Sequence, residues 1–110
     1  MFAVIYRGYL KPDCEKKYHD AWQIVAKYFK EKRGALGSCL HKAQDGMWVA
    51  YSRWPDKATR DASWPGDNAP SDQLPQQVKA AIIAIQESTD PERKLPEICL
   101  EIVNDLLIND

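Results

Sequence analysis

Hydrophobic and polar residues follow two different periods along the chain, and each period predicts a type of element. Residues 2–10 are rich in Val, Ile, Phe and Tyr, which favours a strand. Phe2 and Val4 share one face of this strand, whereas Ala3 and Ile5 share the other. Both faces of its first half are therefore apolar.

A helix is predicted next, from Lys11-Pro12-Asp13 to Gly34. Proline suits the first helical turn, and the Asp13 carboxylate complements the positive end of the helix dipole. The apolar residues that follow recur at helical spacing: Tyr18, Ala21, Trp22, Val25 and Phe29. Gly34 and Gly37 end the helix and begin the next element.

The segment Gly34–Trp54 is predicted to be a β-hairpin, and the candidate site depends on it. Asp45-Gly46 favours a two-residue turn, because glycine accepts a positive φ without steric cost. In that register His41 faces Ala50, and one face of the hairpin is shared by the following residues: Gly37, Cys39, His41, Ala43, Trp48, Ala50, Ser52 and Trp54. Two indoles, an imidazole, a thiol and a hydroxyl among small residues make that face a candidate pocket wall.

The C-terminal half is predicted to contain a short helix, a long loop, a second long helix and a final strand. Residues 57–64 are expected to form the short helix. The segment 65–75, rich in Pro, Asp and Ser, is expected to be a loop that is either a lid or a simple connection. Helical spacing returns with Val78, Ala81, Ile82 and Ile85. The last strand is expected over residues 97–108.

This order of elements predicts an α+β fold. We expect one domain over residues 1–110, with a ferredoxin-like βαββαβ antiparallel sheet and helices on one face. The other face would then expose an apolar patch that includes Val49 and Tyr51. A second subunit packed against this patch would bury it, so we expect a homodimer with two-fold symmetry.

Composition and charge exclude several classes of function. The 110 residues are 45% hydrophobic and 28% charged, which is typical of a single folded domain. A net charge of -1 without a basic stripe disfavours nucleic acid as a partner, and no apolar run is long enough to cross a membrane. With no leader sequence apparent and three scattered cysteines, we expect a cytoplasmic protein with reduced thiols and no metal site.

The chain resembles the antibiotic biosynthesis monooxygenase (ABM) family, whose members form dimeric α+β barrels. The similarity lies in the opening IYRGYLKP, in Tyr18 and Trp22 of the first helix, and in GALGSCLHKAQDG followed by WVAYSRWPDKA. It covers most of the segment 1–65, whereas the C-terminal half is similar only in the order of its elements. The family includes cofactor-free quinone-forming oxygenases and haem-degrading enzymes.

In the polyketide-oxidising branch of this family, a Trp after the third strand and an Asn four residues before it hold the phenolic substrate. They also favour its anion for reaction with oxygen. The resemblance places Trp54 at the Trp and Ala50 at the Asn, while the branch's Tyr falls on Arg60 and its Arg in the later helix has no match. Trp64 resembles a second Trp of the haem degraders. Their haem-ligating His and their Asn in strand one are absent here, which disfavours haem cleavage.

His41 is the candidate catalytic residue, because the predicted register places it beside Ala50, where the Asn is missing. An imidazole there could accept a proton from a phenol or donate a hydrogen bond to the resulting oxyanion. The alternative is an ordinary strand histidine bonded to a backbone carbonyl or water. The candidate substrate-binding residues are Trp48, Ser52, Trp54 and Trp64. The indoles also fit a core or surface role without any ligand.

Two functions from different classes agree with this pattern. The first is a cofactor-independent monooxygenase, an oxidoreductase that oxidises a small electron-rich aromatic with oxygen and without metal or flavin. The second is a non-catalytic dimeric module of the same fold that binds a small apolar molecule or is merely structural, and the absent Asn, Tyr and Arg favour it. An isomerase or lyase in which His41 moves a proton is a third possibility.

Overall fold

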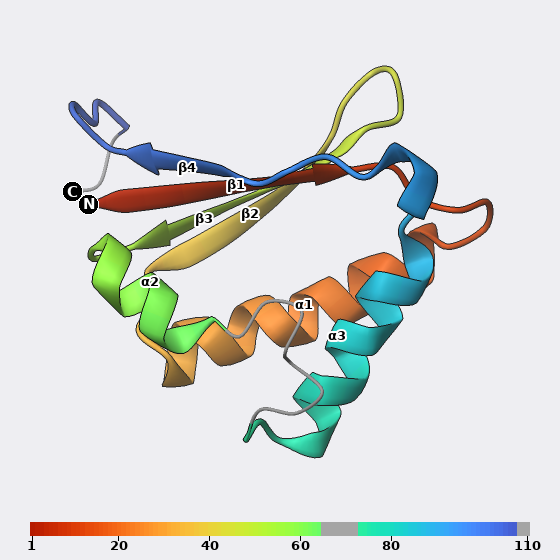
Figure 1. The fold of residues 1–110 in the computed structure, drawn as a ribbon, viewed down its shortest axis with the longest axis horizontal. Coiled ribbons are helices and arrows are strands. Elements are labelled where there is room, and N and C mark those ends of the chain that lie inside the picture. The colour runs from red at the N-terminus through yellow and green to blue at the C-terminus, as the bar shows by residue number, and fades with distance from the viewer. Residues whose placement is uncertain (65–72, 108–110) are drawn as a thin grey trace.

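A four-stranded antiparallel sheet with helices packed on one side forms the part of the chain that the computed structural model describes, residues 1–64 and 73–107 (Figure 1). The strands lie in the order β2-β3-β1-β4. The elements are β1 (Phe2–Gly8), α1 (Glu15–Lys32), β2 (Gly37–Lys42), β3 (Trp48–Trp54), α2 (Lys57–Ser63), α3 (Gln76–Ser88), a 3₁₀ turn (Pro91–Arg93) and β4 (Ile98–Glu101). The predicted α+β class and ferredoxin-like order of elements are confirmed.

Local hydrogen bonds and backbone conformation determine where α2 begins and where α1 ends. The Asp56 carboxylate accepts a hydrogen bond from the Thr59 backbone N–H at 2.7 Å, which caps the start of α2. Beyond the end of α1, Gly34 has a φ of 85°, a left-handed conformation that favours glycine. The chain reverses here, and the Ala35 N–H donates to the Phe29 carbonyl at 3.1 Å. This turn directs the chain into β2.

The hydrophobic core lies between the sheet and the two long helices. Phe2 and Val4 of β1 and Trp54 of β3 meet Phe29 of α1 and Ile82 of α3 in one buried cluster. The rings of Phe29 and Trp54 pack edge to face, with centroids 6.5 Å apart. Figure 1 shows α1 and α3 together on one side of the sheet, with α2 at the end where β3 finishes. The helices therefore cover one face of the two central strands, β1 and β3.

The hairpin between β2 and β3 closes differently from the prediction. The Ala43 N–H donates to the Met47 carbonyl at 2.7 Å and Gly46 has a φ of 91°, so the loop contains three residues and not two. Leu40 consequently pairs with Ala50, and His41 pairs with Val49. The predicted register is wrong by one residue, and a slip of one residue moves every side chain of β2 to the opposite face.

The last strand is shorter than the predicted 97–108. β4 pairs with β1 only from Ile98 to Glu101. The chain then turns, and Asp105 binds the Arg53 guanidinium at 2.6 Å while its carboxylate also accepts the Leu107 N–H at 2.9 Å. The strand ends where its partner strand begins: Glu101 pairs with Phe2, the Ile102 N–H donates to the Met1 carbonyl at 2.9 Å, and β1 has no further residue for the following positions to pair with. Residue 108 lies outside the described residues.

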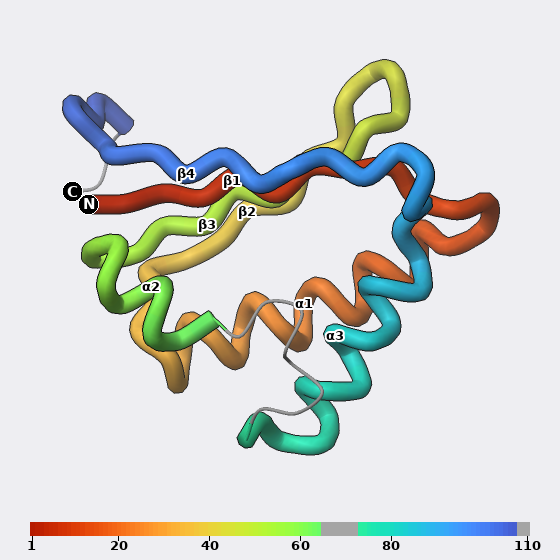
Figure 2. Tube along the Cα trace, viewed as in Figure 1, coloured from red at the N-terminus to blue at the C-terminus, as the bar shows by residue number. Residues whose placement is uncertain are grey.

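The face of the sheet opposite the helices carries apolar side chains. Ile5 pairs with Tyr51 on one side and Ile98 on the other, so all three point to this face, and Val49 follows the same alternation. Among the described helices, none lies over it (Figure 1). Figure 2 shows the chain from the 3₁₀ turn to β4 running beside β1, with residues 102–107 continuing past it. In that tail Val103, Leu106 and Leu107 are 92%, 85% and 67% exposed.

The observed register predicts which engineered cysteine can reach Cys39. Cys39 lies directly opposite Tyr51, where side chains on one face have Cβ atoms about 4.5–5.5 Å apart, close to the separation in a disulfide. We expect Tyr51→Cys to form a disulfide with Cys39 on mild oxidation, seen by peptide mapping under non-reducing conditions. Ser52→Cys is the matched control, because its side chain points to the other face. A Cys39 crosslink in the Ser52→Cys variant and none in Tyr51→Cys would contradict the observed register and support the predicted two-residue turn.

Candidate functional site

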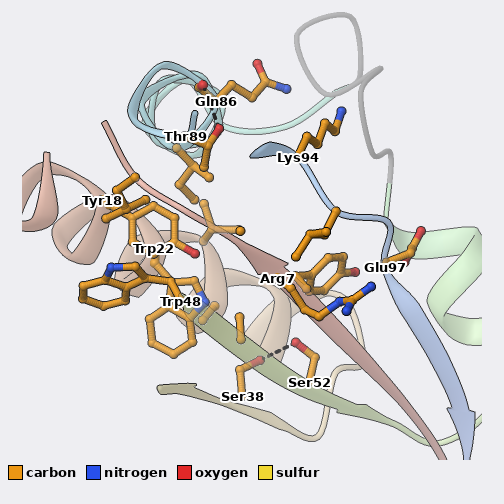
Figure 3. A pocket seen from close by; sticks show the side chains of 18 of the residues that line it. Arg7, Tyr18, Trp22, Ser38, Trp48, Ser52, Gln86, Thr89, Lys94 and Glu97 are labelled. Atoms are coloured by element: carbon orange, nitrogen blue, oxygen red, sulfur yellow. Dashed lines mark hydrogen bonds between the residues drawn. The ribbon is translucent and has the colours of Figure 1, made fainter. Parts of the chain in front are cut away.

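A cavity of about 430 Å³ lies between the covered face of the sheet and the helices α1 and α3 (Figure 3). This volume falls within the range of ordinary small-molecule sites, roughly 300–1,000 Å³. The alternation along β3 explains why the space is empty. Trp48 and Trp54 point toward the helices at the two ends of the strand, while Ala50 and Ser52 between them are too small to fill the gap. Gly8 of β1, which pairs with Trp48, leaves more room.

The walls of the cavity are mostly aromatic. Tyr18 of α1 packs edge to face against Trp48, with ring centroids 5.5 Å apart. At the end of α2, Trp64 packs against Phe29 at 5.1 Å and against Tyr6 at 6.0 Å. Flat aromatic walls favour a planar aromatic ligand, because ring pairs gain energy from offset and edge-to-face packing beyond the area they bury.

Two serine hydroxyls face each other on the floor of the cavity. Ser38 of β2 and Ser52 of β3 are directly opposite in the register, and their Oγ atoms are 3.0 Å apart (Figure 3). Either hydroxyl can donate to the other, so one O–H stays available for a ligand. The other β3 side chains that line the cavity, Trp48, Ala50 and Trp54, are apolar or aromatic, so the two serines supply the hydroxyl groups on this part of the floor.

Tyr6 and Glu97 line the polar side of the cavity, and Arg60 is hydrogen-bonded to both from outside the lining. Arg60 of α2 is only 8% exposed, and its Nη2 donates both to the Tyr6 hydroxyl at 3.2 Å and to the Glu97 carboxylate. Its Nη1 donates to Asp61 at 3.2 Å. Burial raises the pKa of the Tyr6 phenol, and the hydrogen bond from Arg60 only partly offsets this. Tyr6 is therefore a neutral phenol at physiological pH.

Two further polar groups are buried against the cavity. Burial raises the pKa of the Tyr18 phenol, which keeps its proton as well. The Trp54 indole is 3% exposed, and within the described parts of the chain its Nε1–H has no hydrogen-bond acceptor. A buried donor without a partner is costly unless something else accepts its proton.

The structure brings four of the five predicted site residues together. Trp48, Ser52, Trp54 and Trp64 all line the cavity. His41 does not, because the three-residue loop places it on the open face of the sheet, where its Nδ1 lies 3.2 Å from the Val49 carbonyl oxygen. The prediction that His41 faces Ala50 is wrong, and Leu40 occupies that place. The predicted lid falls mainly on residues 65–72, which lie outside the described residues.

Sequence reasoning missed Tyr6, Tyr18, Ser38 and Arg60 as site residues. Tyr6 was detectable, because alternation in β1 puts it on the same face as Phe2 and Val4. Ser38 was assigned to the wrong face by the register error. Arg60 was named only as the residue that stands where the polyketide-oxidising branch has its Tyr. Its burial could not be predicted, since its partner Glu97 is 37 positions away along the chain. Only the folded chain shows that this helical arginine is buried.

Neither a membrane-spanning helix nor a metal-binding cluster is present in residues 1–64 and 73–107. No helix in these ranges combines the length and the apolar character that crossing a membrane requires. No three side chains of His, Cys, Asp or Glu in the same ranges are gathered closely enough to hold a metal ion. The three cysteines are free thiols.

No protein-family model and no curated protein matches the sequence. Solved structures do match the fold. One is an antibiotic biosynthesis monooxygenase with a TM-score of 0.68 and 16% identity, covering 94% of this chain and 100% of that one. The protein Rv0793 from Mycobacterium tuberculosis has a TM-score of 0.69 and 15% identity, with 96% and 98% covered. SnoaB, a cofactor-independent oxygenase from Streptomyces nogalater, has a TM-score of 0.68 and 10% identity, with 96% and 95% covered. The chain therefore adopts the fold of the antibiotic biosynthesis monooxygenases.

Proposed function

We propose that this protein is a cofactor-independent monooxygenase that oxidises a small electron-rich hydroxyaromatic with molecular oxygen. The observation that carries the proposal is the cavity walled by aromatic side chains, among them Trp48, Trp54 and Trp64. The volume of about 430 Å³ suits a ligand of two or three fused rings. The fold, shared with a cofactor-independent oxygenase, supports the same reaction class.

The chemistry needs a bound aromatic anion more than it needs a strong base or a metal. An ionised phenol has an electron-rich ring that can transfer an electron to oxygen directly. At an activated ring CH₂ group, one oxygen atom becomes the carbonyl oxygen and the other leaves as water with both hydrogens. The ring carbon supplies all four electrons, so no further reductant is consumed. The protein would hold the ring between its aromatic walls, exclude water and favour the anion by hydrogen bonding.

A non-catalytic binding module of the same fold is the second candidate. Ala50 favours it, because the floor of the cavity has no side-chain donor at that position. Arg60 favours it too, since its guanidinium is engaged by Tyr6, Asp61 and Glu97. An isomerase or lyase that uses His41 to move a proton is not proposed, because His41 points away from the cavity.

Oxygen uptake by the purified protein tests the leading candidate. With anthrone as the probe, we expect uptake above the protein-free rate, measured with an oxygen electrode. Trp48→Ala removes one aromatic wall of the cavity at a half-buried residue, and we expect it to slow turnover by about 10-fold or more, because the ring of the substrate is then held less firmly in the reactive geometry. His41→Ala is the control and leaves turnover unchanged. Binding of the probe without any oxygen uptake would favour the non-catalytic module.

We also propose that two copies of the chain pack through the open faces of their sheets. The face presents Ile5, Val49, Tyr51 and Ile98, and a patch of this kind on a folded domain marks an interface. A two-fold axis through it would set the same residues of both copies against each other. The exposed apolar tail, residues 103–107, continues from this face and would add to the buried area.

Light scattering after gel filtration tests the dimer. We expect a mass twice the 12.6 kDa of one chain. Val49→Glu places a charge in the middle of the patch and is expected to yield the monomer, because an unpaired charge is costly to bury. Ile83→Glu on α3 is the matched control, since Ile83 is also a partly exposed apolar residue but lies on the helical side. A wild-type protein of monomeric mass would refute the proposed dimer.

A further inference from the structure

Tyr6 lies beside the empty part of the cavity floor. It pairs directly with Ala50 across β1 and β3, and both side chains belong to the face covered by the helices. Residues paired in this way have Cβ atoms about 4.5–5.5 Å apart. The Ala50 methyl leaves the space above it open, and the Tyr6 ring forms one boundary of that space.

The hydrogen bond from Arg60 leaves the Tyr6 proton unused. Arg60 Nη2 donates to the Tyr6 oxygen at 3.2 Å, so that oxygen acts as an acceptor. Among the described residues, none accepts the Tyr6 O–H. A phenol that accepts from a guanidinium becomes a better donor, because the neighbouring positive charge polarises its O–H bond. A ligand oxygen in the cavity can take this proton in a hydrogen bond.

Arg60 is held in place whether or not a ligand is present. Its guanidinium binds the Glu97 carboxylate through Nη2 and Asp61 through Nη1, so the buried positive charge is always paired. The Asp56 cap fixes the start of α2, which carries Arg60. The Tyr6 hydroxyl is therefore held in one position before a ligand binds. Binding then carries no further entropy cost for fixing this side chain.

We propose that Tyr6 donates a hydrogen bond to the phenolate oxygen of the bound hydroxyaromatic, and that Arg60 is the positioning residue for Tyr6. The choice of a hydroxyaromatic as the ligand rests on the proposed function. It assigns the stabilisation of the aromatic anion to β1 and α2, and not to the hairpin. The hydroxyl end of the ligand would lie at the Tyr6 hydroxyl, on the side of the cavity where Arg60 is bound, with its rings between Trp48, Trp54 and Trp64.

Titration of bound 2-naphthol without oxygen tests this directly, because its phenol and phenolate forms differ in absorbance. We expect wild-type protein to lower the apparent pKa of bound 2-naphthol. Tyr6→Phe removes only the hydroxyl, and it is expected to raise that apparent pKa by about one pH unit and to weaken phenolate binding about 10-fold. Tyr51→Phe is the matched control: its hydroxyl also accepts from an arginine, Arg53 Nε at 3.0 Å, but on the open face.

Arg60→Gln separates positioning from direct contact. If Arg60 acts through Tyr6, Arg60→Gln raises the apparent pKa of bound 2-naphthol in the wild-type background but not in the Tyr6→Phe background. Equal effects in both backgrounds would overturn the positioning role. Thermal melting of each variant shows that it is folded, and Tyr6→Phe alone carries the main inference if Arg60→Gln does not fold.

The remaining outcomes are distinct from those of the oxygen-uptake experiment. Failure of wild-type protein to bind 2-naphthol would overturn the inference, and so would an unchanged apparent pKa in Tyr6→Phe. An equal change in Tyr51→Phe would overturn it as well. A higher apparent pKa confined to Tyr6→Phe, in a protein that consumes no oxygen, would support the role of Tyr6 and reject only the oxygenase chemistry.

Discussion

The alternation of side chains along β3 is the constraint on which the cavity depends. Four residues of this strand point toward the helices, and they run large, small, small, large: Trp48, Ala50, Ser52 and Trp54. The two indoles reach the helical layer and hold it away from the strand, while the small pair between them cannot fill the space below it. Helices packed on such a surface enclose a hollow, because interiors close-pack only where side chains meet.

The second constraint is the burial of Arg60, which connects α2 to two strands. Its hydrogen bonds reach Tyr6 on β1 and Glu97 just before β4, so one side chain joins segments far apart in the sequence. A buried guanidinium is tolerated only when it is paired, and Glu97 and Asp61 supply the pairing charge. The same requirement places a polarised phenol at the edge of an otherwise apolar cavity. One interaction thus stabilises the fold and orients the hydroxyl that we propose as a hydrogen-bond donor to the ligand.

Much of the architecture could be predicted from residue pattern alone. The helical spacing of Tyr18, Val25 and Phe29 and the alternation in β1 and β3 each depend on one element only, and all are confirmed. Trp54, Trp48 and Ser52 could be assigned to the same face for the same reason. The fold is shared with structures only 10–16% identical to this chain, as expected when burial pattern and not residue identity specifies it.

The sequence by itself determined the periods of its elements, and therefore which residues of a given strand or helix share a face. It did not determine how two elements meet. Ala43 to Met47 can close with a two-residue or a three-residue loop, and only the packed sheet selects the latter, which turns His41 to the open face and Leu40 toward the helices. The bond between Arg60 and Glu97 likewise exists only once α2 and β4 are in place. The local pattern specifies which side chains of an element share a face, because backbone geometry sets the period. Tertiary packing specifies which residues of two elements contact each other, because these contacts depend on loop closure and on residues far apart in the sequence.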